Sequence, residues 1–311
     1  MIRRGLAAGV LVIAAWVVLP LWQRQDHGPP MAGSMPGATA SLPPATELKG
    51  PAPAPVRYAY QPECPGQSGP CLRWHLVSTR GEQWWLPGVS GEDTFVLSDD
   101  GTRAAYPHGG GFVLHDLMTG TVTPLRVEGE GEPMFSLDGR HLAVGREVAD
   151  LATGRVHRLN GEARGWTSSG VITSTLKPDD RTPGRVNVTV FTVSSPEGRR
   201  LRRSTSPGDL SSDGVLSPSG RQFATLMREV TPTSVTTTSI LINRERAVTP
   251  RLPAGWTITT ILRWRGEDGL LVRMRGPANR IAYHIVDLTT GRPLPGGVEE
   301  RGLSTVIGRL N

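Results

Sequence analysis

Lysine is almost missing from this chain. Lys49 and Lys177 are the only lysines among 34 basic residues, so arginine supplies nearly all of the positive charge behind the formal balance of +6 and the pI of about 10.0. A basic balance of this kind fits nucleic acid, an anionic lipid surface or an acidic cell-wall polymer. So one-sided a use of arginine is also typical of codon bias in a GC-rich genome, and we predict no nucleic-acid partner.

Cysteine is scarce too, with only Cys64 and Cys71 in the stretch CPGQSGPC. Two thiols are too few for a structural zinc site. Gly and Pro between the two cysteines allow the tight reversal of a small loop, and an exported location would favour oxidation. We therefore predict a Cys64–Cys71 disulfide, with two free thiols as the alternative.

The chain has few aromatic residues, 5% in all, and no long acidic or Gln/Asn-rich tract that would indicate wholesale disorder. Its 38 glycines and 27 prolines are typical of a protein with many tight turns. The composition therefore favours a turn-dense, mostly β fold.

Enzyme signatures are absent. The HGGGF stretch at 108 to 112 resembles an esterase oxyanion loop, but no Gly-x-Ser-x-Gly nucleophile turn accompanies it. Ser174 and Lys177 match Ser-x-x-Lys without its partner words, and Asp100-Gly101 lacks the spacing of a sialidase Asp-box. The seven histidines lack metal-ligand spacing, and no phosphate-binding loop occurs. We predict no catalysis, no metal and no cofactor, although the glutamates of EGEGEP could hold calcium if that loop is not simply solvated.

An uncharged run at the start of the chain predicts a membrane anchor. Residues 5 to 22, GLAAGVLVIAAWVVLPLW, are long enough to span a bilayer at about 1.5 Å per residue. Arg3 and Arg4 precede the run, which places the N-terminus in the cytoplasm and the rest outside. A cleaved signal peptide is the alternative, but the nearest small-x-small triplet, at 38 to 40, lies far downstream.

The segment after the anchor is rich in Pro, Ala, Gly and Ser and reads as a tether. This gives four parts: a cytoplasmic tail, a transmembrane signal anchor, a disordered linker and a folded domain, at residues 1-4, 5-22, 23-55 and 56-311.

Two short words recur along the folded domain. The word Asp-Leu-x-Thr-Gly appears at 116 to 120, 150 to 154 and 287 to 291. Upstream of each copy lies a Ser-x-x-Gly hairpin word, as in LSDDGTRAAY, FSLDGRHLAV and LSPSGRQFAT. Each word is typical of a hairpin with Gly at a positive φ. Two hairpins in series predict a four-stranded meander, and Asp116, Asp150 and Asp287 are then turn residues rather than catalytic carboxylates.

Counting the meanders predicts six blades. The outer hairpins fall about 34 to 51 residues apart, at 75–86, 112–125, 147–159, 188–201, 239–252 and 283–294. The first unit has only VRYAY (56–60) before its outer hairpin, and STVIGRL (304–310) has no partner after it. A ring in which the last strand completes the first blade explains both, so we predict an all-β, six-bladed β-propeller closed by a C-terminal strand.

These words resemble the repeats of TolB-type and Trp-Asp-like bacterial β-propellers, over roughly residues 56 to 311. The chain departs from the best-known Trp-Asp repeats because it lacks their Gly-His and Trp-Asp dipeptides. The resemblance implies binding of a protein or ligand on one face of the ring rather than a fixed chemistry.

Loops at one mouth of the channel are the expected binding region. The candidate ligand-binding residues share a place in or beside these loops: His108, Arg146, Trp166, Arg228, Trp256 and Arg275. Trp166 and Trp256 could instead pack between blades. The arginines of GRRLRRS (198–204) lie on an outer strand, where they either protect an edge or bind an anionic polymer.

The sequence thus predicts a membrane-tethered extracytoplasmic module that binds a protein or a cell-envelope polymer. The alternative is a propeller-based polysaccharide lyase or hydrolase, with site residues dispersed around the channel mouth.

Overall fold

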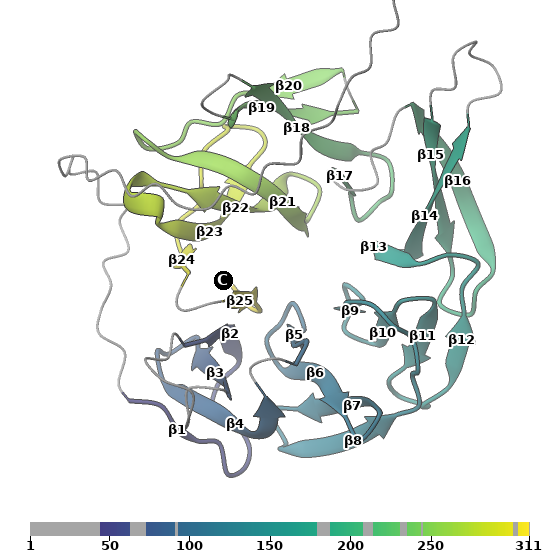
Figure 1. Cartoon of the computed structure of the whole chain (residues 1–311), viewed down its shortest axis with the longest axis vertical. Helices are drawn as coiled ribbons and strands as arrows, with labels where there is room; N and C mark the ends of the chain where they lie inside the picture. The colour runs from purple at the N-terminus through teal and green to yellow at the C-terminus, as the bar shows by residue number, and fades with distance from the viewer. Residues whose placement is uncertain are drawn as a thin grey trace, which may run out of the picture. The chain divides into compact units, whose positions relative to one another are not determined.

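The computed structural model describes residues 44–62, 73–90, 93–178, 187–207, 214–230, 235–243, 245–300 and 304–310. These residues fall within one compact unit, Gly33–Asn311. They form six antiparallel sheets of four core strands each, arranged around a common centre, and contain no α-helix (Figure 1). The six-bladed, all-β propeller is therefore confirmed.

Blades 1 to 3 occupy the first half of the domain. From the centre outward, their core strands are β25 (Ser304–Ile307), β2 (Val56–Gln61), β3 (Arg73–Ser78) and β4 (Gln83–Ser90); β5 (Val96–Leu97), β6 (Arg103–His108), β7 (Gly111–Asp116) and β8 (Thr121–Leu125); and β9 (Pro133–Phe135), β10 (His141–Val144), β11 (Glu147–Asp150) and β12 (Val156–Arg158).

Blades 4 to 6 follow the same order. Their strands are β13 (Ala163–Thr167), β14 (Gly170–Pro178), β15 (Asn187–Ser194) and β16 (Arg200–Pro207); β17 (Gly214–Leu216), β18 (Phe223–Val230), β19 (Val235–Ile242) and β20 (Arg246–Val248); and β21 (Thr257–Arg265), β22 (Gly269–Arg275), β23 (Ile281–Asp287) and β24 (Val298–Glu299). A single 3₁₀ turn, η2 (Pro277–Asn279), connects β22 to β23.

The ring closes as the sequence predicts. β25, from the end of the chain, pairs antiparallel with β2, with Tyr58 opposite Ile307 and Gln61 opposite Ser304. Ile307 and Leu310 are buried at the junction of blades 6 and 1. The first blade is thus built from both ends of the folded domain.

The repeated Asp turns have the structural role expected of them. The Asp116 carboxylate accepts hydrogen bonds from the amides of Met118 and Thr119 at 3.1 and 3.0 Å, and Asp150 and Asp287 make the equivalent pairs. These amide bonds hold the pKa values of Asp150 and Asp287 below their usual range. The word recurs because each of these blades needs the same turn between its two outer strands.

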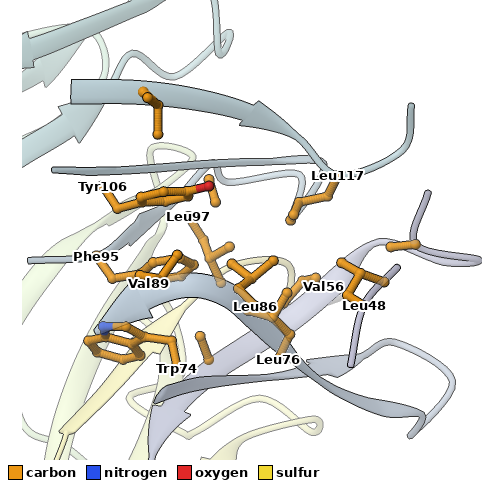
Figure 2. Packing of buried hydrophobic residues seen from close by; sticks show 14 residues of the cluster. Leu48, Val56, Trp74, Leu76, Leu86, Val89, Phe95, Leu97, Tyr106 and Leu117 are labelled. Atoms are coloured by element: carbon orange, nitrogen blue, oxygen red, sulfur yellow. The ribbon is translucent and has the colours of Figure 1, made fainter. Parts of the chain in front are cut away.

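The linker boundary at residue 55 was wrong. β1 (Thr46–Glu47) adds a fifth, parallel strand beside β4, and Leu48, Ala52 and Ala54 are buried. Figure 2 shows Leu48 beside Val56 in the cluster shared by blades 1 and 2. The composition of this segment, rich in Pro and Ala, does not indicate the packing, because only a few of its apolar side chains contact the core.

Arginine side chains join neighbouring blades. Arg103 of blade 2, Arg202 of blade 4 and Arg246 of blade 5 each donate to a backbone carbonyl of the next blade, those of Gly139, Gly220 and Leu288. Arg57 of blade 1 donates to the Gly296 and Gly297 carbonyls of blade 6, at 2.7 and 3.0 Å. A planar guanidinium with several fixed donors suits such bridges better than an ammonium. Part of the arginine content therefore serves packing.

Candidate functional site

The innermost strands enclose a cavity of about 630 Å³ at the centre of the ring. Residues of all six innermost strands, β5, β9, β13, β17, β21 and β25, contribute to its wall. Ligand pockets in proteins typically measure about 300–1,000 Å³. The channel is therefore large enough to hold a small molecule.

Much of the cavity wall is apolar. Met134, Phe135 and Leu137 line it from blade 3, and Leu262 lines it from blade 6. Leu262 is one of the few large apolar side chains left exposed, at 39%. Apolar lining with a few polar groups is the usual composition of a binding pocket.

One side of the channel carries a carboxylate held by two arginines. Asp99, in the turn after β5, receives Arg263 Nη1 at 2.7 Å and Arg265 Nη1 at 3.0 Å. The same two arginines, on the last residues of β21, also donate to the carbonyls of Ile307 and Gly308 at 2.9 and 2.7 Å. We call Asp99, Arg263 and Arg265 the closure triad, because it ties blades 2 and 6 to the strand that closes the ring.

The closure triad has one more positive charge than negative charge. Burial lowers the pKa of Arg263 to about 10, an effect that Asp99 opposes and that the neighbouring Arg265 reinforces. The Nε atoms of both arginines are buried and have no hydrogen-bond partner among the described residues. The triad is thus short of acceptors for its donors.

A second polar cluster lies on the face of blade 6 toward blade 1. Tyr283 donates to Glu300 Oε1 at 2.6 Å, and Arg273 Nη2 donates to Glu300 Oε2 at 3.1 Å. Burial, together with the bond to Glu300, raises the pKa of the Tyr283 phenol well above its usual value. Arg273 and Tyr283 line the cavity, but their polar groups are committed to one another through Glu300.

Of the six predicted ligand-binding residues, only Trp166 lines the channel. Its side chain is buried, and its indole N–H donates to the Met134 carbonyl of blade 3 at 3.0 Å. Trp264 makes the equivalent bond from blade 6 to the Val215 carbonyl of blade 5, at 2.9 Å. The alternative of packing between blades therefore describes how Trp166 is held, although one side of it meets the cavity.

Trp256 is also buried, in the core between blades 5 and 6. Its indole stands against the backbone of Gly276, and the Arg280 guanidinium lies 5.4 Å from its ring centroid. Packing between blades again accounts for its position.

The remaining four predicted residues are exposed and lie at one end of the ring. His108, Arg228 and Arg275 lie at or near the ends of second strands, and Arg146 lies between β10 and β11. His108 lines a separate hollow of about 450 Å³ together with Asp93 and Glu128. Arg228 donates to the Thr259 carbonyl of blade 6 at 3.0 Å. The structure leaves these residues around the rim and does not bring them together.

Sequence reasoning missed the closure triad and the Arg273–Tyr283–Glu300 cluster. A signal for the triad was present, since Arg263 and Arg265 alternate on the innermost strand of blade 6. Asp99 occupies the position after Ser in the hairpin word LSDDG, where the corresponding residue of FSLDG is Leu137. The position that differs between these two copies of the repeat is thus the one at which Asp99 supplies the negative charge of the triad.

The described residues bear on only some of the predictions about metals, the membrane and the disulfide. Within the described residues no group of three His, Cys, Asp or Glu side chains is placed to hold a metal ion. Within the same residues no helix is long and apolar enough to cross a bilayer. The anchor at residues 5 to 22 and the Cys64–Cys71 disulfide lie outside the described residues and stay predictions.

No family model matches this chain, and no curated protein matches it. Among solved structures, the chain is similar to one described as "Crystal structure of the eukaryotic initiation factor", with 13% identity over 80% of this chain and 97% of the other and a TM-score of 0.38. It is also similar to "Complex of KlAtg21 with coiled-coil of AgAtg16", with 10% identity over 80% and 85% of the two chains and a TM-score of 0.33. Likeness at these scores carries no argument about function.

Proposed function

We propose that this chain is a membrane-tethered extracytoplasmic β-propeller that acts as a binding module, with the central channel as its ligand site. The observation that carries the proposal is the cavity of about 630 Å³, lined by all six innermost strands. Its wall is mostly apolar with a few charged groups on one side, which is typical of a ligand-binding pocket. The uncharged run at residues 5 to 22 supports the tether.

The alternative of a propeller-based enzyme draws on one observation. Arg273, Tyr283 and Glu300 converge at the channel wall, and a tyrosine beside an arginine could serve acid–base chemistry. Against it, Tyr283 is only 4% exposed, and its raised pKa keeps the phenol protonated at neutral pH. The cluster therefore favours a structural bridge over a general base.

A photo-crosslinking experiment tests the channel as the ligand site. A photoreactive residue replaces Leu262 in one full-length variant and Val122 in a control variant; Val122 is also an exposed apolar residue, at 49%, but lies on the outer strand β8. In cells, the proposal expects adducts at position 262 and few at position 122. Equal labelling at both positions, or none at 262, would contradict it.

The tether needs its own test. N-terminal sequencing of the protein from washed membranes should recover residues before Leu6, and protease added outside intact cells or spheroplasts should digest the propeller. Recovery of a soluble form that begins near Ala40 would show instead that the first segment is a cleaved signal peptide.

A further inference from the structure

Each arginine of the closure triad has one buried N–H group that no group of the described residues accepts. Each arginine uses Nη1 for Asp99 and Nη2 for a backbone carbonyl, and within the described part of the chain each Nε–H is left without an acceptor. Arg263 lines the cavity, and its side chain is 30% exposed, whereas Arg265 is 19% exposed and is not part of the cavity wall. Asp99 also lines the cavity, so Arg263 is the cationic member of the triad that a ligand in the channel can reach.

A second unused polar group lies on the neighbouring strand. Thr305 of β25 also lines the cavity, and its Oγ1 is buried with no hydrogen-bond partner among the residues that the structure describes. Ile307, two residues further along β25, supplies the carbonyl that binds Arg263. Buried polar groups without a partner are uncommon in native proteins, and each calls for a specific explanation.

Charge at the two ends of the channel is unequal. Glu162 is paired with Arg164 at 2.8 Å and Glu300 with Arg273 at 3.1 Å, so these groups cancel. Glu132 is exposed and precedes β9, whereas Asp99 follows β5. Because the innermost strands of a propeller run in the same direction, Glu132 and the closure triad belong to opposite ends of the channel. One uncompensated positive charge thus remains at the triad.

We propose that the channel binds a small amphipathic anion, whose single carboxylate or phosphate head lies against Arg263 and whose apolar body packs on Leu137 and Leu262. This inference rests on the proposed function and names its ligand class. One excess positive charge suits a single anionic head group rather than a polyanion. The exposed Leu262 comes directly before Arg263 on β21, so an apolar surface and the cation belong to one short stretch of wall.

Calorimetry on the full-length chain in zwitterionic lipid nanodiscs tests the proposal, with empty nanodiscs as the blank. The probes are octanoate, octyl phosphate, octanol and octyltrimethylammonium, which share one apolar body and differ in the head group. We expect the two anions to bind and the cation not to bind. Binding of octanoate but not of octyl phosphate would identify the head group as a carboxylate. Binding of octyl phosphate but not of octanoate would identify it as a phosphate.

Arg263→Gln and Arg265→Gln form a matched pair of variants. Both lose one bond to Asp99 and one to a carbonyl of the closing strand, but only Arg263 lines the cavity. Arg263→Gln should weaken the binding of octanoate by about tenfold, because hydrogen bonds to charged groups are strong, and Arg265→Gln should weaken it by less than about threefold. Asp99→Asn should strengthen the binding of octanoate, because it removes the carboxylate that competes for Arg263.

Three results would overturn the inference. One is octanol binding as tightly as octanoate, which would make the site purely apolar. Another is no binding of any anion to the wild-type chain, a result that needs no variant to fold. The third is an equal loss in Arg263→Gln and Arg265→Gln. If crosslinks at position 262 still identify a ligand of another class, the proposed function stands and only the anion fails.

Discussion

Asp99→Asn is the change that most directly tests how the ring is held closed. The substitution keeps the side-chain shape but removes the charge that Arg263 and Arg265 share. Breaking a fully buried pair costs about 3–5 kcal/mol, and an exposed pair contributes about 0–1 kcal/mol. The Asp99 side chain is 23% exposed, between these limits. We expect a loss of about 2 kcal/mol, or a Tm lower by about 4–8 °C.

Thermal unfolding followed by circular dichroism measures this loss, and Arg140→Gln is the control. Arg140 pairs with Asp138 at 4.0 Å, with side chains 80% and 57% exposed, so its removal should leave Tm nearly unchanged. In the double variant Asp99→Asn/Arg265→Gln, part of the loss should return, because one of two neighbouring positive charges is gone. An Asp99→Asn Tm equal to the wild-type value would refute the role of the closure triad in closing the ring.

Four further predictions concern the fold and its chemistry. Leu48→Ala should destabilise the domain by about 2–5 kcal/mol, whereas truncation before residue 44 should leave the unfolding midpoint in denaturant unchanged. Gly101→Ala should cost far more than Gly109→Ala, although both glycines have positive φ (70° and 61°), because a Cβ at Gly101 meets the Val56 carbonyl and one at Gly109 meets nothing within 4 Å; thermal midpoints compare them. The Asp100 carboxyl is partly buried, which raises its pKa, but hydrogen bonds from Ser98 and Thr102 outweigh this effect and lower the pKa from 3.8. The contribution of Asp100 to stability is thus present above pH 3.8 and is lost as the pH falls further. Asp100→Asn should therefore flatten the acid limb of a pH–stability profile. Mass spectrometry of the unreduced chain should give a Cys64–Cys71 peptide two hydrogens lighter than the reduced form, and quantitative alkylation without reductant would contradict the disulfide.

Much of the fold could be predicted because its determinants are local and repeated. The turn carboxylates and glycines specify each hairpin within a few residues, as Asp116 does through the amides of Met118 and Thr119. Ring closure is a contact across the whole domain, yet an unpaired strand at each end was enough to indicate it. The strand β1 was missed because its register beside β4 depends on backbone pairing rather than on an apolar pattern.

The candidate site could not be predicted in the same way, because its residues come from copies of the repeat that depart from the common pattern. Asp99 follows β5, Arg263 lies near the end of the innermost strand of blade 6, and Thr305 belongs to the closing strand. Nothing in the local sequence relates these three positions; only the closure of the ring brings them to one wall of the channel. The conspicuous residues behave in the opposite way: Trp166 and several arginines hold blades together. In a repeat fold, local chemistry therefore specifies the blades, while the site arises where the last blade meets the first and where the repeat is least regular.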